Sequence, residues 1–506
     1  MIDHQVIDIL KSFNTEDIKQ FRRFLSSPYF NRSDNVTKSF ELLIKFHPNF
    51  SSKRLTKEYI GSLMFGSENY NDSTVRNLLL DLLNTLEVFL MQDNFRKSAT
   101  YAFDNLLKEL RDKKLTDVFQ RNTEKLSLQY SELKDVDSEY YMAKHKLELN
   151  KFNFFALNQK VVEEKDIDGH FEELYSSGLY LTIHYVIEMI CLYVTNVFFS
   201  IQYNRPVSTS LFEQVVETVN LRGLEKLLEK NKYSFILKIY IAMLNAFKNF
   251  NDDNAYYEYK NILKQNIDLL GKDEICFHYN NLMNFTTLKA RNAGSESFET
   301  YYEESFNLHD EILKNGYYKN KKSEYLDYST YRDILLVALR LKKINWVENF
   351  IISHSSKLHK SDRDNMMNLA YTYLYYEKGE YEKSWKYLNK IKIDYFVYKY
   401  DVKNYALKIY YDLGYYEETL QLIDNYKKFL DRNEMKSDES KNKIKNFISY
   451  LNKLIMFKFG QLPSKHFSTY RRRLEMANDT ISHNWILQKY QEQAAEIRKS
   501  RIAKSA

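Results

Sequence analysis

Residues 375–385 read YYEKGEYEKSW and residues 410–419 read YYDLGYYEET, so an aromatic pair followed by a glycine occurs twice. The two glycines, Gly379 and Gly414, are 35 residues apart in a chain that has 11 glycines among 506 residues. Apolar and aromatic residues recur every three or four positions on both sides of each glycine, which is the spacing of an amphipathic helix. Glycine adopts the left-handed conformation that ends one helix and lets the chain turn into the next. The two stretches therefore predict a repeated unit of helix, glycine turn and helix.

The composition of the whole chain favours the same architecture. The 11 glycines and 4 prolines are about 3% of the chain, against roughly 12% in an average protein. Tight turns and phosphate-binding loops depend on these residues. With 44% hydrophobic and 28% charged residues, the chain can bury a core and is not of disordered composition. The sequence predicts an all-α protein.

Other helix pairs are expected before and after the glycine turns. Trp346 lies 35 residues before Tyr381, and Tyr416 lies 35 residues after it. Each of the three aromatic residues is expected to begin the second helix of a pair. Further pairs are expected at residues 235–263 around the turn 251–254, at 276–313 around Ala293-Gly294, and from 444 onward around Gly460. We expect stacked helix pairs, an α-solenoid, over residues 171–475.

Residues 330–430 resemble the tetratricopeptide repeat family, whose units are helix pairs of about 34 residues. The resemblance rests on two sets of matching positions: Tyr375, Gly379, Tyr381 and Leu388, then Tyr410, Gly414, Tyr416 and Ile423. Where that family prefers small residues at the crossing of the paired helices, this chain has Thr372, Ser384, Leu407 and Thr419. The resemblance implies a concave face that binds peptides or partner domains. It would place five residues on that face: Tyr373, Tyr376, Asn404, Lys408 and Tyr411.

The N-terminal part, residues 1–97, is different in kind and predicts a compact helical head. Asn14 and Asp17 have the spacing of a capping box at the start of a helix. A short helix is expected from Lys57 to Phe65, ending at Gly66, and a long helix with an apolar stripe from Asp72. Residues 98–170 are expected to form long, charged bridging helices, and residues 476–506 a C-terminal helix with a basic end.

No G-x-G-x-x-G, G-x-S-x-G or H-E-x-x-H motif occurs in the sequence. Gly61 and Gly66 match half of a phosphate-binding loop, but Ser67 stands where its lysine should be. His184 and Glu188 lie one helical turn apart, and we interpret them as a helix satisfying its own buried polar groups. Cys276 and His278 have no second pair of ligands. The sequence therefore predicts a protein that is not an enzyme and has no cofactor or metal.

Two features bear on localisation. The N-terminus has neither a basic segment nor an apolar one, and two cysteines cannot form a disulfide framework, so we expect a cytoplasmic protein. The apolar helix at residues 179–201 approaches membrane-spanning length. Because it carries Glu188, and a charged group near the bilayer centre costs about 3 kcal/mol, we expect a buried helix and no membrane span.

Two functions are consistent with these features. The first is a protein-protein interaction scaffold that binds a peptide or partner protein on the concave face of the repeats. The second is a nucleic-acid-binding regulator that uses a helix-turn-helix-like segment of the head, where Arg76 is the basic residue near the start of the longer helix. The C-terminal part from Pro463 has nine basic and four acidic residues. The cluster Arg471, Arg472 and Arg473 is its candidate basic contact for an acidic partner.

Overall fold

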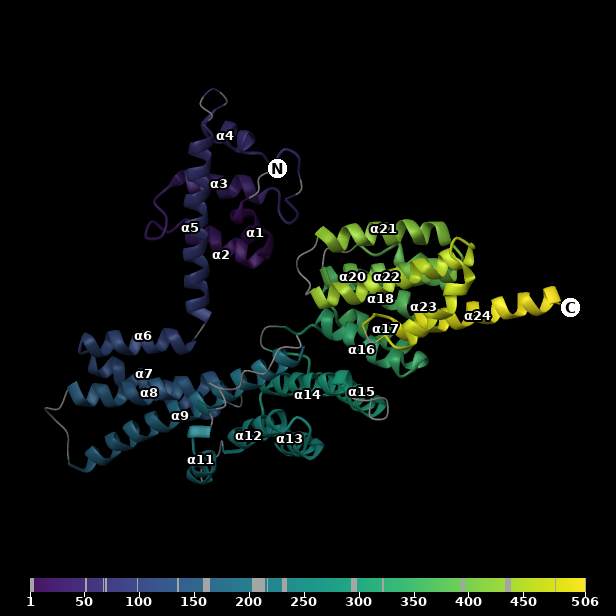
Figure 1. Cartoon of the computed structure of the whole chain (residues 1–506). Coiled ribbons are helices and arrows are strands. Elements are labelled where there is room, and N and C mark those ends of the chain that lie inside the picture. Colours follow the sequence, from purple (N-terminus) through teal and green to yellow (C-terminus); the bar gives the residue numbers. More distant parts are fainter. Residues whose placement is uncertain are drawn as a thin grey trace. The chain divides into compact units, whose positions relative to one another are not determined.

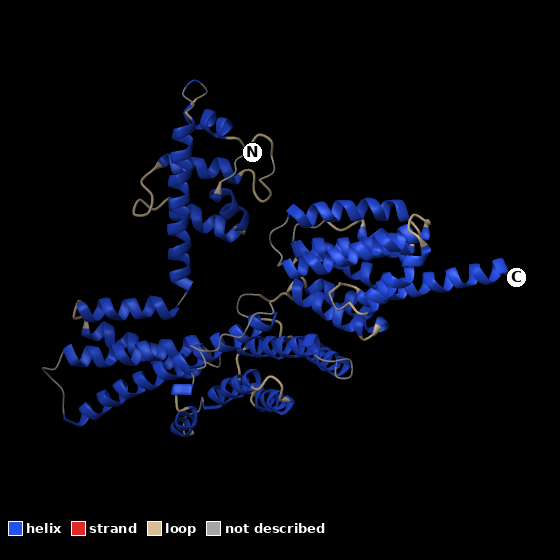
Figure 2. Cartoon of the chain, in the orientation of Figure 1, coloured by secondary structure: helices blue, strands red, loops and turns tan. Residues whose placement is uncertain are grey.

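A computed structural model of the chain describes residues 4–50, 52–66, 68, 71–97, 99–133, 136–157, 164–202, 214–215, 217–229, 234–292, 298–320, 323–392, 396–432, 438–477 and 479–505. All regular structure in these residues is helical, with 23 α-helices, three short 3-10 helices and no strand (Figure 2). The all-α prediction is confirmed. The chain divides into two compact units. Unit 1 contains residues 1–191 and 215–237, and unit 2 contains residues 192–214 and 238–506.

The head of unit 1 consists of five helices around one apolar core (Figure 1). They are α1 (Gln5–Ser12), α2 (Thr15–Leu25), α3 (Asp34–Ile44), α4 (Lys57–Phe65) and α5 (Asp72–Lys97). Phe21 is fully buried at the centre, with its ring 4.9 Å from that of Phe40 and 5.1 Å from that of Phe89. Helix α5 contributes the apolar stripe expected from its sequence: Val75, Leu78, Leu79, Leu82, Leu86 and Phe89 are buried, whereas Leu90 is exposed.

Two helix ends in the head follow from local sequence as predicted. The Asn14 side chain accepts hydrogen bonds from the backbone N–H groups of Glu16 and Asp17, and the Asp17 carboxylate accepts one from the Asn14 N–H. This reciprocal pair is a capping box and starts α2. Gly66, with φ of 85°, ends α4 in a conformation that favours glycine.

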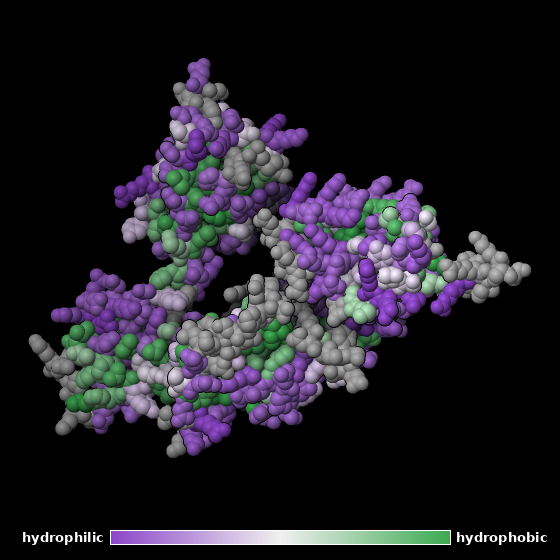
Figure 3. All heavy atoms as spheres, in the orientation of Figure 1, coloured by the Kyte–Doolittle hydropathy of each residue, from purple (hydrophilic) through white to green (hydrophobic). Residues whose placement is uncertain are grey.

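The remainder of unit 1 is built from longer helices, as expected for the bridging segment. They are α6 (Ala99–Asp112), α7 (Thr116–Glu132), α8 (Ser138–Leu157), α9 (Glu164–Gln202), whose last residues belong to unit 2, and α11 (Leu221–Leu228). The rings of Phe119 and Phe154 stack at 4.1 Å between α7 and α8. Apolar residues are also visible at the surface of this part of the molecule in Figure 3. On α9, Phe171 and Tyr175 each have 59% of their surface exposed.

Unit 2 is a succession of helices that begins within α12, and from α14 to α24 each helix contacts its neighbours along the chain. They are α12 (Ser234–Lys248), α13 (Asp253–Gln265), α14 (Lys272–Asn292), α15 (Phe298–Asn315), α16 (Tyr328–Arg340), α17 (Ile344–His354), α18 (Lys360–Glu377), α19 (Tyr381–Leu388), α20 (Phe396–Asp412), α21 (Tyr416–Arg432), α22 (Asp438–Lys458), α23 (Phe467–Glu475) and α24 (His483–Ser505). The 3-10 helices are η3 (Ile267–Leu269), η4 (Ser355–Lys357) and η5 (Ser464–His466). The helix pairs expected at 235–263, 276–313 and from 444 are present, although the expected turn at Ala293-Gly294 lies outside the described residues.

The glycine turns have the geometry that their sequence predicts. Gly379 and Gly414 have φ of 75° and 81°. The N–H of Gly379 donates to the Tyr376 carbonyl and the N–H of Glu380 donates to the Tyr375 carbonyl; Gly414 and Tyr415 repeat both bonds to Tyr411 and Tyr410. These paired bonds satisfy the last carbonyls of α18 and α20.

The same turn occurs before α17 without a glycine, and it corrects the expected alignment of Trp346. Lys342 has φ of 54°, its N–H donates to the Leu339 carbonyl, and the N–H of Lys343 donates to the Ala338 carbonyl. Helix α17 then begins at Ile344. Ile344, and not Trp346, is therefore the counterpart of Tyr381, because a lysine took the left-handed position two residues earlier than the aromatic spacing implied. The indole of Trp346 instead packs on Phe306 and Phe350.

The crossing positions named from the sequence are buried. Thr372, Ser384 and Thr419 have no exposed surface and Leu407 has 1%. The Ser384 hydroxyl donates to the Thr372 carbonyl across α18 and α19 at 2.7 Å. A larger side chain at Ser384 would separate these two helices, so serine and threonine serve here in place of smaller residues.

Candidate functional site

Unit 2 contains a cavity of about 1450 Å³ whose wall comes from several helices of the chain. Helices α14, α15, α16, α18, α20 and α24 each contribute lining residues. Small-molecule pockets usually occupy roughly 300–1,000 Å³. The volume and the length of chain that surrounds it suit an extended ligand better than a compact one. We call this cavity the groove.

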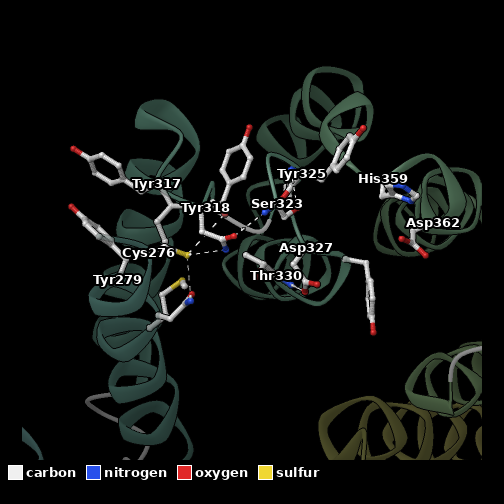
Figure 4. Close-up of a pocket in the computed structure, with 16 residues that line it drawn as sticks. Cys276, Tyr279, Tyr317, Tyr318, Ser323, Tyr325, Asp327, Thr330, His359 and Asp362 are labelled. Carbon is white, nitrogen blue, oxygen red and sulfur yellow. Dashed lines mark hydrogen bonds between the residues drawn. The ribbon is translucent and has the colours of Figure 1, made fainter. Parts of the chain in front are cut away.

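A second cavity of about 380 Å³ adjoins the groove and shares Asn280, Met283, Asp327 and Thr330 with it. Figure 4 shows Cys276 beside Tyr318 on one side of this cavity, with His359 and Asp362 across from them. The Cys276 thiol receives long contacts from the amides of Asn280 at 3.7 Å and Asn320 at 4.0 Å. Burial raises the pKa of this thiol. Burial therefore favours the neutral thiol over the thiolate, which is the form that acts as a nucleophile or a metal ligand.

Asp412, at the end of α20, joins three elements at one end of the groove. Its side chain is 4% exposed. Its Oδ2 accepts from the Tyr376 hydroxyl at 2.7 Å and from the Trp485 indole N–H at 3.4 Å, and its Oδ1 lies 2.8 Å from the Lys489 Nζ. The carboxylate thereby ties α18 and α24 to α20, and its negative charge is compensated by the ammonium of Lys489.

Lys408 lies next to this network among aromatic rings. Its Nζ is 5.0 Å from the centre of the Tyr405 ring, 5.7 Å from that of Tyr376 and 5.9 Å from that of Trp485. Burial lowers the pKa of Lys408 to about 8, although the charges of Glu377 and Asp412 act in the opposite direction. Burial also raises the pKa of the Glu377 carboxyl. This end of the groove therefore holds a weakly solvated cation whose pKa lies closer to neutral pH than that of an exposed lysine.

A second buried network lies behind the groove wall. The Arg332 guanidinium pairs with the Asp401 carboxylate, and the Tyr373 hydroxyl donates to the same carboxylate at 3.1 Å. The side chains of Arg332 and Asp401 are 20% and 17% exposed. Burial alone would lower the pKa of Arg332, but the charge of Asp401 and the hydrogen bond to it together raise this pKa above its usual value. This network connects α16, α18 and α20, which form one side of the groove.

The five residues predicted to face the groove fall into two groups. Tyr376 and Lys408 line it, whereas Tyr373, Asn404 and Tyr411 are not among its lining residues. Tyr373 has no exposed surface, Tyr411 has 7% and packs its ring against Trp485, and the Asn404 side-chain oxygen accepts from the Tyr426 hydroxyl. All five residues lie on α18 or α20, but contacts with Asp401, Tyr426 and Trp485 direct Tyr373, Asn404 and Tyr411 into the packing between helices. Whether any of the five contacts a partner stays a prediction.

The basic cluster lies on α23. Arg471 Nε is 3.1 Å from the Glu475 carboxylate, the guanidinium of Arg473 lies 5.9 Å from the ring of Tyr470, and Arg472 is exposed. None of the three arginines lines the groove. Their expected contact with an acidic partner stays a prediction.

Two polar residues of the groove were not predicted from the sequence. Ser305 and His309 lie one turn apart on α15 and line the groove with 3% and 4% of their surface exposed. Neither the Ser305 hydroxyl nor His309 Nδ1 has a hydrogen-bond partner. Their spacing of four residues in an amphipathic helix is visible in the sequence, but it does not reveal which face is buried.

The pairs singled out as possible catalytic or metal groups have structural partners. His184 Nδ1 and the Glu188 carboxylate both bond the Ser138 hydroxyl, at 2.8 and 2.6 Å, so they join α9 to α8 and do not satisfy each other. His278 Nδ1 bonds the Tyr259 hydroxyl at 2.8 Å. Within the described residues, no three His, Cys, Asp or Glu side chains form a group that could hold a metal ion.

One helix in the described part of the chain is long and apolar enough to cross a membrane by length and composition. It is the stretch Ile167–Ile201 of α9, and 39% of its most apolar window is buried. The helix is therefore less buried than its sequence suggested. The prediction that it does not span a membrane remains a prediction.

Comparison with known protein families, with curated proteins and with solved structures found no match for this chain.

Proposed function

We propose that the chain is a non-enzymatic interaction protein of the tetratricopeptide-like helical-repeat type, and that the groove of unit 2 binds an extended segment of a partner polypeptide. The observation that carries the proposal is the groove itself, because about 1450 Å³ of space is bordered by residues of α14, α15, α16, α18, α19, α20 and α24. A stack of helix pairs offers an extended surface of this kind.

The local geometry of the pairs supports the resemblance. The turns at Lys342, Gly379 and Gly414 share one pattern of backbone bonds, and Ser384 bonds Thr372 where the paired helices cross. The lining mixes aromatic, hydroxyl, amide and charged side chains, which suits the polar backbone and varied side chains of a peptide. Because both cysteines are free thiols, we place this activity in the cytoplasm.

The nucleic-acid alternative receives no comparable support. Arg76, the basic residue near the start of α5, pairs with Asp72 at 2.6 Å, and the apolar stripe of α5 is used in the core of the head. A recognition helix presents basic and polar residues to phosphates and base edges. We therefore propose the interaction protein as the function, with nucleic-acid binding as an outcome that its test can reveal.

Purification of the tagged full-length chain from native lysate, with and without nuclease, tests the proposal when it is combined with paired charge reversals. Arg340→Glu changes an exposed residue of the groove, and Lys386→Glu makes the same change of charge on an exposed residue of α19 that does not line it. We expect a discrete protein partner that survives nuclease, is lost with Arg340→Glu and is kept with Lys386→Glu. Partners that are lost after nuclease treatment, or that bind both charge-reversed variants as they bind the wild type, would contradict the proposal.

A further inference from the structure

Ser305 and His309 form an unusual pair because both line the same cavity and each has a buried polar atom without a hydrogen-bond partner. Among the described residues whose buried side-chain polar atoms lack a partner, they are the two that line the groove. Residues at positions i and i+4 of a helix are neighbours, with Cβ atoms about 6 Å apart. A polar atom that is buried without a hydrogen bond destabilises the folded chain, so a pair of them at one place indicates a group that is supplied from outside.

The surroundings limit the charge of that group. His309 is 4% exposed, and burial lowers the pKa of its imidazole to about 4, so the ring is neutral at physiological pH. Leu336, Val337 and Leu339 of α16 line the same cavity. A carboxylate or an ammonium bonded to this pair would gain no compensating charge from the neutral ring or from the hydroxyl, which makes its burial there costly.

The hydrogen-bonding capacity of the pair limits the group further. A neutral imidazole has one N–H donor and one acceptor nitrogen, and a hydroxyl donates once and also accepts. An amide carries an N–H donor and a carbonyl acceptor side by side. It can therefore satisfy both residues whichever nitrogen of His309 carries the hydrogen, whereas a purely accepting or purely donating group cannot.

We infer that Ser305 and His309 form a subsite of the groove that binds an amide group of a polypeptide ligand. The inference rests on the proposed function and names the chemistry that one part of the groove recognises. The amide comes either from the peptide backbone or from the side chain of an asparagine or glutamine, and the experiment below separates the two.

A library of random 12-residue peptides displayed on phage and selected on the full-length chain supplies the probe. The best binder is then synthesised and its affinity measured by calorimetry for the wild type, Ser305→Ala and His309→Leu. We expect each substitution to weaken binding roughly tenfold. Single backbone amides of the peptide are then replaced by esters, and single Asn or Gln residues by Ala. The amide bound at the subsite is the one whose replacement weakens binding to the wild-type protein but does not weaken binding to Ser305→Ala.

Two controls separate this subsite from general effects on folding and from the groove as a whole. Ser384→Ala removes a buried serine hydroxyl that has a partner, so we expect a lower Tm and unchanged peptide affinity. Ser305→Ala removes a hydroxyl that lacks one, so its Tm should not fall. Suppose that Arg340→Glu abolishes binding while Ser305→Ala and His309→Leu bind as the wild type does. The peptide then binds in the groove, but the proposed amide subsite is wrong and an ordered water occupies it. If no peptide is selected, or if Arg340→Glu also has no effect, both the subsite and the proposed function are contradicted.

Discussion

In the head, Phe21 packs against Phe40 and Phe89 in an apolar core. In the helix pairs of unit 2, by contrast, the buried hydroxyl groups of Tyr373 and Tyr376 donate hydrogen bonds to the carboxylates of Asp401 and Asp412. Among the described head residues, Ser39 is the buried polar side chain, and it bonds a carbonyl of its own helix. Apolar packing has no preferred direction, but a bond to a buried carboxylate requires one particular neighbour. We infer that the head is stabilised by the packing of apolar side chains, and that directional hydrogen bonds fix the order and register of the helix pairs.

Removal of the Asp401 carboxylate should give the largest difference in lost stability between the helix pairs of unit 2 and the head. Asp401→Ala leaves the mostly buried Arg332 guanidinium with the exposed Asp333 as its carboxylate partner and removes the acceptor of Tyr373, so we expect a loss of about 3 kcal/mol in the stability of α16, α18 and α20. Hydrogen exchange measured on peptides from these helices reports that loss. Phe21→Leu in the head, a smaller apolar change, should cost about 1 kcal/mol and affect only head peptides. Equal losses from the two substitutions would remove the distinction between the regions.

Lys408 should make the stability of unit 2 depend on pH where that of the head does not. Lysine in the unfolded chain titrates near 10.5, and burial brings folded Lys408 to about 8, so between these values the unfolded chain binds more protons. The penalty from Lys408 is therefore complete below pH 8 and disappears as the pH rises toward 10.5. Because this side chain is only partly buried, we expect the stability difference between wild type and Lys408→Met to change by about 2 kcal/mol over that range. Urea unfolding at pH 7, 8.5 and 10 measures it. The exposed Lys386→Met is the control, and a profile of Lys408→Met that parallels the wild type would refute the prediction.

Tyr376→Phe should show that the tyrosine hydroxyls contribute more than ring volume. The substitution keeps the ring but removes one donor from the buried Asp412, so we expect a loss of about 2 kcal/mol. Tyr490 offers a matched comparison, because its hydroxyl donates to a neutral acceptor, the Tyr450 carbonyl, at 3.0 Å. Tyr490→Phe should cost about 1 kcal/mol. The two values are compared by thermal and urea unfolding, and the account fails if Tyr490→Phe is the more damaging change.

The same contrast explains which features could be predicted from the sequence. Helix type, the caps at Asn14 and Gly66 and the turns at Gly379 and Gly414 depend on neighbours along the chain, and these predictions are confirmed. The turn at Lys342 was displaced by two residues because lysine gives no signal for a left-handed conformation. The inward direction of Tyr373 depends on Asp401, which lies on another helix. The groove likewise depends on how helices between α14 and α24 pack together. Local spacing cannot report such distant pairings.

The turns should produce the smallest effects. Gly379→Ala adds a Cβ that meets nothing within 4 Å, so its cost comes from the left-handed backbone alone and should be about 1 kcal/mol. Lys342 occupies the equivalent position, so Lys342→Gly should stabilise the chain by a similar or smaller amount. Both are measured by urea unfolding against the wild type. A destabilising Lys342→Gly would show that the two turns are not equivalent.

The central claim, that a polypeptide partner lies in the groove, is tested most directly by photo-crosslinking from defined positions. Benzoylphenylalanine is placed at Val337, which lines the groove, or at Ile352 on α17, which is 69% exposed and does not line it. Each full-length chain is irradiated in nuclease-treated native lysate and the adducts are identified by mass spectrometry. The account predicts a discrete polypeptide adduct from Val337 that is absent from Ile352 and is suppressed by Arg340→Glu. Adducts of equal yield from both positions, or an adduct at Val337 that Arg340→Glu leaves unchanged, would contradict it.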